Sequence, residues 1–540
     1  MERGGGAFDR DAAWERLTGS GRDDPEPWDL LVVGGGITGA GILLEAARRG
    51  VRAALVEQRD FAWGSSSRSS KMAHGGLRYL MMGRVGLTRA CAVERARMLE
   101  ELPGLVDPLG FLFPGYRRRF PGRWSFMPLL ALYNRLAGRR TEPFHPPHEF
   151  ELLAPHVRGE GLKGGARCVE GITDDARLVL RVLREAGRSG ALALNYAAAT
   201  QPLWAGGRIR GAAVTDRVSG RTGEVRARRV INATGPWVDQ LMGGKGDPGV
   251  VRPLRGSHLV FPFWRLPVAQ AVALFHPADR RGVFVTPWEG TTLVGNTDLD
   301  HGEDLDREPR MTTEEVDYLL EALRFQFPAL NVKAEHALSS FAGVRPVIGS
   351  GASLAPSKER RDHRIWEDRG LVSVSGGKLT TYRRVALEAL QAAGLCGAGR
   401  PSGKAPEGRF AAATPPVSLE RELGRLAARR LAGRYGVEVG ALEGCAREGE
   451  LAPVPGTLTP WVELRWSART SGVVHLEDLL LRRTRLGIVS REGGTAFLDR
   501  VKGICMEELG WSEADWQREL TAYRRLWDTC YRVQTTRGRR

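Results

Sequence analysis

The spacing of apolar and polar residues near the start of this 540-residue chain predicts a strand, a helix and a second strand. Residues 30–33 form a short apolar run that leads directly into a group of glycines. Residues 38–49 carry apolar side chains at helical spacing, and a second apolar run at 53–56 ends on Glu57. Such a pattern is typical of a βαβ unit with two parallel strands.

The turn after the first strand carries Gly34, Gly36 and Gly39, which satisfy G-x-G-x-x-G. In this motif the first glycine permits a tight turn, the second admits a pyrophosphate, and the third lets the helix pack closely on the strand. The helix amides would face the phosphates, and Glu57 would accept hydrogen bonds from the ribose hydroxyls. The pattern as a whole predicts an adenine dinucleotide site rather than a plain βαβ unit with a glycine turn.

The loop that follows Glu57 indicates which dinucleotide binds. Residues 65–79 read SSSRSSKMAHGGLRY, a small, polar and basic sequence. A loop rich in hydroxyls and amides can wrap a cofactor that stays bound, whereas a nicotinamide cofactor leaves in each cycle. The sequence therefore predicts FAD. Because no cysteine lies between Gly64 and Gly76, we expect it to be held noncovalently.

Further apolar patterns predict elements along the rest of the chain. Short apolar runs predict strands near 191–196, 229–235, 272–275 and 282–286. Helical spacing predicts helices at 12–17, 178–186, 419–435, 464–483 and 513–526. The Gly-, Pro- and Ala-rich residues 396–416 are typical of a linker.

Charge changes this picture only slightly. The formal net charge is +16, and only eight of the 79 basic residues are lysine. Enrichment in arginine, alanine and glycine together favours a compositional bias over nucleic-acid binding, although the positive field still favours anionic surfaces. The six cysteines are scattered, which favours a reducing compartment and argues against a metal or iron–sulfur site.

Residues 117–140 have the composition of an interfacial membrane anchor, with arginines flanking an apolar stretch that contains Trp124, Phe126, Leu130 and Tyr133. A buried core helix with solvated flanks is the alternative. No apolar run approaches the roughly 20 residues of a membrane span, and the N-terminus lacks a hydrophobic signal region. We therefore expect a cytoplasmic protein held peripherally at the inner face of the cell membrane.

Several blocks beyond the glycine motif carry a specific resemblance. In the order of the chain they are TDDARLVL (173–180), NATGPWV (232–238), RGSHLV (255–260), VGNTD (294–298), GVRP (343–346), SGGKLTTYR (375–383) and LLLRRT (479–484). With DLLVVGGGITGAG and the serine-rich loop, they resemble the FAD-dependent, quinone-linked glycerol-3-phosphate dehydrogenases over nearly the whole chain. The resemblance implies flavin-dependent oxidation of sn-glycerol 3-phosphate to dihydroxyacetone phosphate, with electrons passed to a membrane quinone. It leaves a homodimer open.

The implied fold class is α/β, with a Rossmann-like, glutathione-reductase-type FAD domain, an antiparallel-sheet substrate domain and a helical C-terminal domain. We expect an N-terminal extension at 1–27 and a discontinuous FAD-binding domain from 28–87, 159–252 and 342–395. A cap domain would comprise 88–158 and 253–341. The linker at 396–416 would lead to the helical domain at 417–540. The resemblance and the motifs assign cofactor contacts to Gly34, Gly36, Ile37, Thr38, Gly39, Glu57, Ser66, Ser67, Ser70, Lys71, His74, Gly75, Thr234, Gly235, Gly343, Gly377, Lys378, Leu379 and Thr380.

Oxidation of an alcohol by a flavin needs a base and a charge that stabilises the reduced ring, and a phosphate ester needs fixed cations. His258 is our first choice of base, and Arg345 is an alternative that its high pKa disfavours. Arg345 would contact substrate or form a structural salt bridge, and Lys378 would meet the flavin or the phosphate. Substrate contacts are expected from Arg78, Tyr79, Arg345, Lys378 and, by alignment with the family, Arg361.

Two other functions remain open from the sequence. One is an oxidase of the same fold that passes electrons to oxygen, with glycerol 3-phosphate or an amine as substrate. The other is a basic flavoprotein that binds nucleic acid or partners without turnover. The group of cations around the predicted pocket disfavours both the amine oxidase and the non-catalytic protein.

Overall fold

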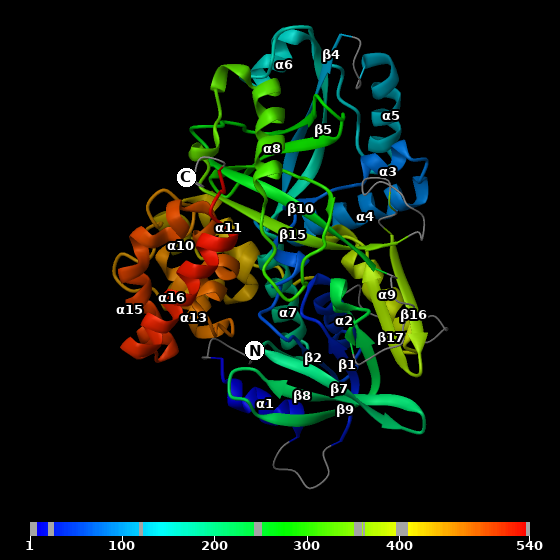
Figure 1. Cartoon of the computed structure of the whole chain (residues 1–540), viewed down its shortest axis with the longest axis vertical. Helices are drawn as coiled ribbons and strands as arrows, with labels where there is room; N and C mark the ends of the chain where they lie inside the picture. The colour runs from blue at the N-terminus through cyan, green and yellow to red at the C-terminus, as the bar shows by residue number, and fades with distance from the viewer. Residues whose placement is uncertain are drawn as a thin grey trace.

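The computed structural model describes residues 8–19, 26–117, 122–241, 251–349, 359, 362–395 and 409–535. Within these residues the chain forms two β-sheets and a helical C-terminal domain, which lies at the side of both sheets (Figure 1, orange to red). This arrangement matches the predicted α/β class.

The first sheet contains the predicted βαβ unit. Strands β1 (Trp28–Val33) and β2 (Ala53–Val56) pair in parallel, and β1 also pairs in parallel with β9 (Thr222–Asn232). The sheet has the order β16-β17-β9-β1-β2-β6, and β8 extends it from β9 to β7. The remaining strands are β6 (Leu192–Leu194), β7 (Ala197–Ala205), β8 (Arg208–Asp216), β16 (His363–Asp368) and β17 (Leu371–Gly376).

Helices cover both faces of β1 because its apolar side chains alternate between them. Leu30 and Val32 face a core formed with α2 (Ile37–Ala47), α7 (Asp175–Arg188) and α9 (Tyr382–Ala392). Leu31 and Val33 face a second core that includes α1 (Arg10–Thr18) and strands β7 to β9. A strand buried on both faces explains the continuous apolar run at 30–33.

The close contact of α2 with β1 requires a glycine at position 39. A Cβ atom built on Gly39 would lie 1.9 Å from the carbonyl oxygen of Gly34. Gly34 itself has a φ of +112°, and a Cβ there would lie 2.6 Å from the oxygen of Ala233 on the neighbouring turn. Both glycines therefore serve the backbone geometry predicted from the motif.

The second sheet has the order β14-β10-β13-β12-β11-β4-β5-β3, with β15 paired to β10. One face packs on α8 (Thr313–Gln326) and the other on α5 (Arg123–Leu136). Helices α3 (Leu77–Met81), α4 (Val85–Glu101) and α6 (Pro147–Leu153) lie beside it. Its strands are β3 (Met72–Ala73), β4 (Val106–Tyr116), β5 (Leu162–Thr173), β10 (Val251–Pro262), β11 (Ala271–Phe275), β12 (Gly282–Trp288), β13 (Thr291–Gly295), β14 (Leu299–Asp300) and β15 (Ser339–Ile348).

Three strands of this sheet differ from the predicted division of the chain. β3, β5 and β15 lie largely within the segments 28–87, 159–252 and 342–395 that we assigned to the FAD-binding domain, yet all three pair within the second sheet. The sheet to which a strand belongs depends on its pairing with strands distant in sequence. Local apolar spacing cannot predict that pairing.

The C-terminal domain is helical, as predicted, but two of its predicted helices are divided. The helix expected at 419–435 breaks at Gly424, whose φ is +78°. The helix expected at 464–483 ends at Thr470 and resumes at Asp478 after a turn that contains Gly472. The elements are α10 (Val417–Leu423), α11 (Arg425–Tyr435), α12 (Val439–Gly444), α13 (Trp461–Thr470), the π-helix η9 (Asp478–Arg483), α14 (Leu486–Val489), α15 (Leu498–Leu509) and α16 (Glu513–Cys530).

The predicted membrane anchor is only partly at the surface. Phe126, Leu130 and Tyr133 are buried on α5 against the second sheet, so our expectation that Phe126 and Leu130 sit at a bilayer is wrong. Their helical spacing reflects a core-facing stripe. Trp124, in contrast, is 87% exposed. In the part of the chain that the structure describes, no helix combines the length and apolarity needed to cross a bilayer.

Candidate active site

A cavity of about 840 Å³ lies between the two sheets. The glycine turn and Glu57 form one part of its wall, and residues of β15, the β17–α9 turn and α3 form another. Most predicted site residues line it: Gly34, Gly36, Ile37, Thr38, Glu57, Ser66, Ser70, His74, Arg78, Tyr79, Thr234, Gly235, Gly343, Arg345, Gly377, Lys378, Leu379 and Thr380.

The glycine end of the cavity fits a dinucleotide. The backbone N–H of Ile37, at the start of α2, donates to Ser66 Oγ at 3.0 Å, which joins the helix to the serine-rich loop. Glu57 accepts from the backbone N–H groups of Gly35 at 2.6 Å and Arg59 at 2.9 Å. Burial raises the pKa of Glu57, while these two N–H groups oppose that rise. Glu57 is therefore fixed in the cavity wall, where a ribose hydroxyl can donate to it.

Five predicted residues do not reach the cavity wall, and Arg361 lies outside the described residues. Gly39 supports the helix packing, and Gly75 donates its N–H to Glu170. Ser67 and Lys71 lie on the outer side of the loop, where Lys71 Nζ donates to the Ser67 carbonyl at 2.6 Å. The fifth is His258.

Lys71 is a buried ion-pair partner. Its Nζ lies 2.8 Å from Asp175, and neither side chain is exposed. Burial lowers the pKa of Lys71 to about 8, although the Asp175 charge opposes this change. The sequence indicated a cofactor contact for Lys71 because it follows the serines directly. In the structure Lys71 has a left-handed backbone, with a φ of +58°, and its side chain is directed away from the cavity wall.

His258 lies behind the cavity wall on β10. Its Nε2 is 2.9 Å from Ser70 Oγ, and its ring stacks on Phe341 with centroids 4.8 Å apart. Its Nδ1 is buried without a hydrogen-bond partner among the described residues. Burial lowers the pKa of His258 well below its usual value, and the charges of Arg345 and Lys71 lower it further. His258 thus reaches the cavity only through Ser70.

Arg345 and Lys378 approach the cavity from different elements. Arg345 is 23% exposed and pairs with Asp298 at 3.1 Å. Its guanidinium lies over Gly256, where a Cβ would lie 1.9 Å from Nη2. Lys378 Nζ lies 3.3 Å from the centroid of the Tyr79 ring, a cation–π contact that joins the β17–α9 turn to α3.

Sequence reasoning missed the carboxylate that accompanies these cations. Asp298 lines the cavity and lies 3.9 Å from Arg281 as well as near Arg345. The block VGNTD contains it, but neither spacing nor residue type indicated a partner 47 residues away. Arg345 therefore forms the salt bridge considered from the sequence and also lines the cavity, where its contact with substrate stays a prediction.

Comparison with known proteins identifies the fold. The family model for FAD dependent oxidoreductases matches residues 29–383, and a model described as the C-terminal domain of alpha-glycerophosphate oxidase matches residues 395–516. An aerobic glycerol-3-phosphate dehydrogenase of Staphylococcus epidermidis is 36% identical over 483 residues, which cover 85% of this chain and 86% of that protein. The corresponding Staphylococcus aureus protein (strain USA300) is 34% identical over 515 residues, covering 91% and 92%.

The chain belongs to the FAD-dependent glycerol-3-phosphate dehydrogenase family. A solved member from Bacillus halodurans, in complex with FAD, superimposes with a TM-score of 0.76 at 31% identity and covers 97% of this chain and 98% of that one. An L-alpha-glycerophosphate oxidase from Mycoplasma pneumoniae is similar in fold alone, with a TM-score of 0.55 and 20% identity, covering 71% and 98%. As in other members of the family, FAD is the cofactor of this chain.

Replacing Glu57 with Gln should weaken FAD binding, because a neutral amide cannot replace a fixed carboxylate toward a ribose. Losing such a charge-assisted contact costs about 1.5–3 kcal/mol, or roughly 10- to 150-fold in the FAD dissociation constant. Titration of deflavinated protein with FAD measures this change. Glu45→Gln, at the far end of α2, is the control and should bind FAD normally. Equal affinity of the Glu57 variant and wild type would exclude the ribose contact.

Proposed function

We propose that this protein oxidises sn-glycerol 3-phosphate to dihydroxyacetone phosphate, with hydride transfer to noncovalent FAD and onward transfer of electrons to a membrane quinone. FAD supplies the two-electron acceptor. The convergence of Arg78, Arg345 and Lys378 on one cavity carries the proposal, because a phosphate dianion needs such a set of cations. The names of the Staphylococcus and Bacillus relatives support the same substrate.

Two of the three cations are held by neighbouring side chains, which favours a site prepared for an anion. Arg345 is oriented by Asp298 and occupies the space above Gly256, while Lys378 rests on the Tyr79 ring. A phosphate that binds there replaces water around cations that are already held in place, so little conformational freedom is lost on binding. An amine substrate would meet repulsion from the same group.

Arg345→Met and Lys378→Met should each raise the concentration of glycerol 3-phosphate needed for half-maximal flavin reduction by about 10- to 150-fold, the effect of one lost charge-assisted contact. Anaerobic mixing with substrate, followed by flavin absorbance, measures it. Arg252→Met is the control, since Arg252 pairs with Asp300 and Glu359 outside the cavity wall. If both cavity variants needed the same concentration of glycerol 3-phosphate as wild type for half-maximal flavin reduction, the phosphate would bind elsewhere.

The proton acceptor is a choice between two histidines. His74 lines the cavity next to Arg78 and Tyr79, whereas His258, our first choice from the sequence, lies behind Ser70. A general base must come within hydrogen-bond distance of the proton that it removes. The geometry therefore favours His74 as the base, with His258 orienting Ser70.

His74→Asn should slow flavin reduction at saturating substrate by about 10²-fold or more and remove the lower limb of its pH–rate profile. His258→Asn should keep that limb, because His74, the proposed base, would still be present. Stopped-flow absorbance between pH 5 and 9 distinguishes the two variants. A profile that loses its lower limb only in His258→Asn would return the role of base to His258.

Electron transfer to a membrane quinone requires a surface that can meet the bilayer. The candidate is the surface formed by α3, α4 and α5, which contact one another. Met81, Met82 and Val85 are about half exposed there, and Trp124 is 87% exposed. Met81 also lines the cavity, so this apolar surface reaches the cavity mouth. α5 and the segment that follows it also carry exposed arginines, among them Arg123, Arg135 and Arg140. Apolar and basic side chains in this arrangement favour an anionic bilayer that holds a quinone.

Replacing Met82, Val85 and Trp124 together with serine should reduce co-sedimentation with phosphatidylglycerol vesicles and slow quinone reduction, while anaerobic flavin reduction by substrate stays unchanged. The control carries serine at Val417 and Leu426, apolar residues of the C-terminal domain that are more exposed than Met82 and Val85. Equal vesicle binding by all three proteins would contradict a membrane role for this surface. Rapid turnover with oxygen alone would favour the oxidase alternative.

A further inference from the structure

The loop between Glu57 and Lys71 forms much of the cofactor wall, yet it contains little regular structure. Its only helical turn is η1 (Ser65–Ser67), and side-chain contacts hold the rest. Ser66 accepts from the start of α2, and Ser65 Oγ donates to the Val344 carbonyl on β15. The position of this loop therefore sets the shape of the cavity, and the opposite side of the loop meets the C-terminal domain.

Arg485 holds the C-terminal end of this loop. It is fully buried, and its guanidinium donates to Asp174 at 2.8 Å, to Asp175, and to the Ser67 carbonyl at 3.4 Å. Asp175 in turn accepts from Ser69 through the backbone N–H at 2.9 Å and the hydroxyl at 2.7 Å. Arg485 thus contacts the loop once directly and once through Asp175.

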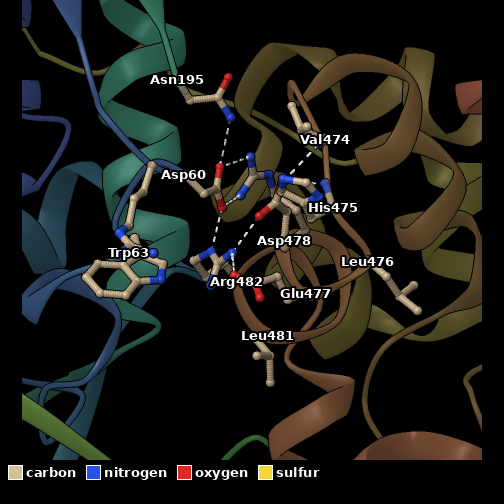
Figure 2. Close-up of polar contacts among 12 residues, drawn as sticks. Asp60, Trp63, Asn195, Val474, His475, Leu476, Glu477, Asp478, Leu481 and Arg482 are labelled. Carbon is tan, nitrogen blue, oxygen red and sulfur yellow. Dashed lines mark hydrogen bonds and ion pairs between the residues drawn. The ribbon is translucent and has the colours of Figure 1, made fainter. Parts of the chain in front are cut away.

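Arg482 and Arg483 hold the N-terminal end of the same loop at Asp60. Figure 2 shows Arg482 beside Asp60. Arg483 donates to both carboxylate oxygens of Asp60, at 2.6 and 2.8 Å, and Arg482 donates at 2.6 Å. Asn195 donates to Asp60 from the opposite side at 3.0 Å. Burial alone would raise the pKa of Asp60, but the two arginine charges hold it at about 2. Asp60 is therefore ionised and fully engaged at neutral pH.

We propose that the segment 482–485 of the C-terminal domain is a positioning element for FAD, in which Arg485 fixes Ser66 to Ser70 and Arg482 and Arg483 fix Asp60. Retention of FAD then depends on a docked C-terminal domain. The proposal rests on the FAD site and not on the identity of the substrate, so it can fail independently of the proposed reaction.

If Arg485 only stabilised the fold, its removal would have the same effect on FAD release as removal of any other buried ion-pair partner. Breaking any buried ion pair lowers stability, because one charge stays desolvated without its partner. The C-terminal domain offers a matched case in Arg465, which is equally buried and pairs with Glu450, Glu507 and Glu508. Arg465 makes none of the hydrogen bonds described for the cofactor loop. Comparing Arg485 with Arg465 therefore separates general stability from positioning of the loop.

The test uses Arg485→Met and Arg465→Met as holoproteins without substrate. After dilution at a temperature below both melting points, free-flavin fluorescence reports FAD release, and amide hydrogen exchange reports order in residues 64–71. Arg485→Met should release FAD about 10-fold faster or more, as expected for a lost charge-assisted contact, and should exchange faster in that loop. Arg465→Met should melt earlier but release FAD within about twofold of wild type, since its loop contacts remain.

Equal acceleration of FAD release in both variants, or none in either, would overturn the proposal. Where Arg485→Met does not fold, Arg485→Lys and Arg465→Lys provide the same comparison with the charge retained. Lysine presents a compact ammonium and cannot reproduce the divergent guanidinium contacts to Asp174, Asp175 and Ser67. Unchanged FAD release and loop exchange in Arg485→Lys would also overturn the proposal.

Discussion

The two carboxylates at the start of α7 join the three parts of the molecule. Asp174 and Asp175 follow directly after β5 of the second sheet, and α7 packs on α2 beneath the first sheet. Arg485 reaches both carboxylates from the C-terminal domain. Lys71 of the cofactor loop completes the group. Two adjacent anions at one point could not remain buried without cations from several segments, so their pairing requires the domains to dock.

This dependence explains where the arginines are used. From the sequence, the arginine content indicated a compositional bias and a positive field that favours anionic surfaces. The largest fully buried side chains nevertheless include six arginines, at positions 95, 177, 434, 482, 483 and 485. Arg434, for example, pairs with Glu289 at 2.7 Å and Glu463 at 3.0 Å. Guanidinium groups suit such sites because they satisfy several carboxylates in fixed directions. Part of the arginine content therefore holds the interior together rather than generating an external field.

Local features of the fold could be predicted because local spacing determines them. The glycine turn, β1, β2 and α2 follow from a strand buried on both faces and from close backbone contact. The division of the 464–483 helix could not, because its apolar spacing continues past Thr470 while Gly472 turns the chain with a φ of +61°. Likewise, the stripe of Phe126 and Leu130 has the same spacing whether it meets a sheet or a bilayer.

The candidate site shows the same difference between local features, which could be predicted, and distant contacts, which could not. Residues carried by motifs, such as Glu57 and Lys378, line the cavity as expected. The environment of each group depends on contacts between strands distant in sequence. His258 faces Phe341 and Gly295 across two strand pairs, and a Cβ on Gly295 would lie 2.3 Å from its ring. Phe341 and Gly295 bury His258 behind Ser70. This burial, and not the residue type, keeps the imidazole neutral.

Arg345 shows the same principle for charge. Its guanidinium occupies the space that a side chain at Gly256 would fill, and Asp298 holds it from the other side. A dianionic ligand that approaches Arg345 therefore enters a site where one carboxylate is already present. In the proposed reaction, Arg78 and Lys378 would offset that repulsion, so recognition of a phosphate would depend on the whole group. Affinity for the anion would then depend on how the second sheet, α3 and the β17–α9 turn are held together.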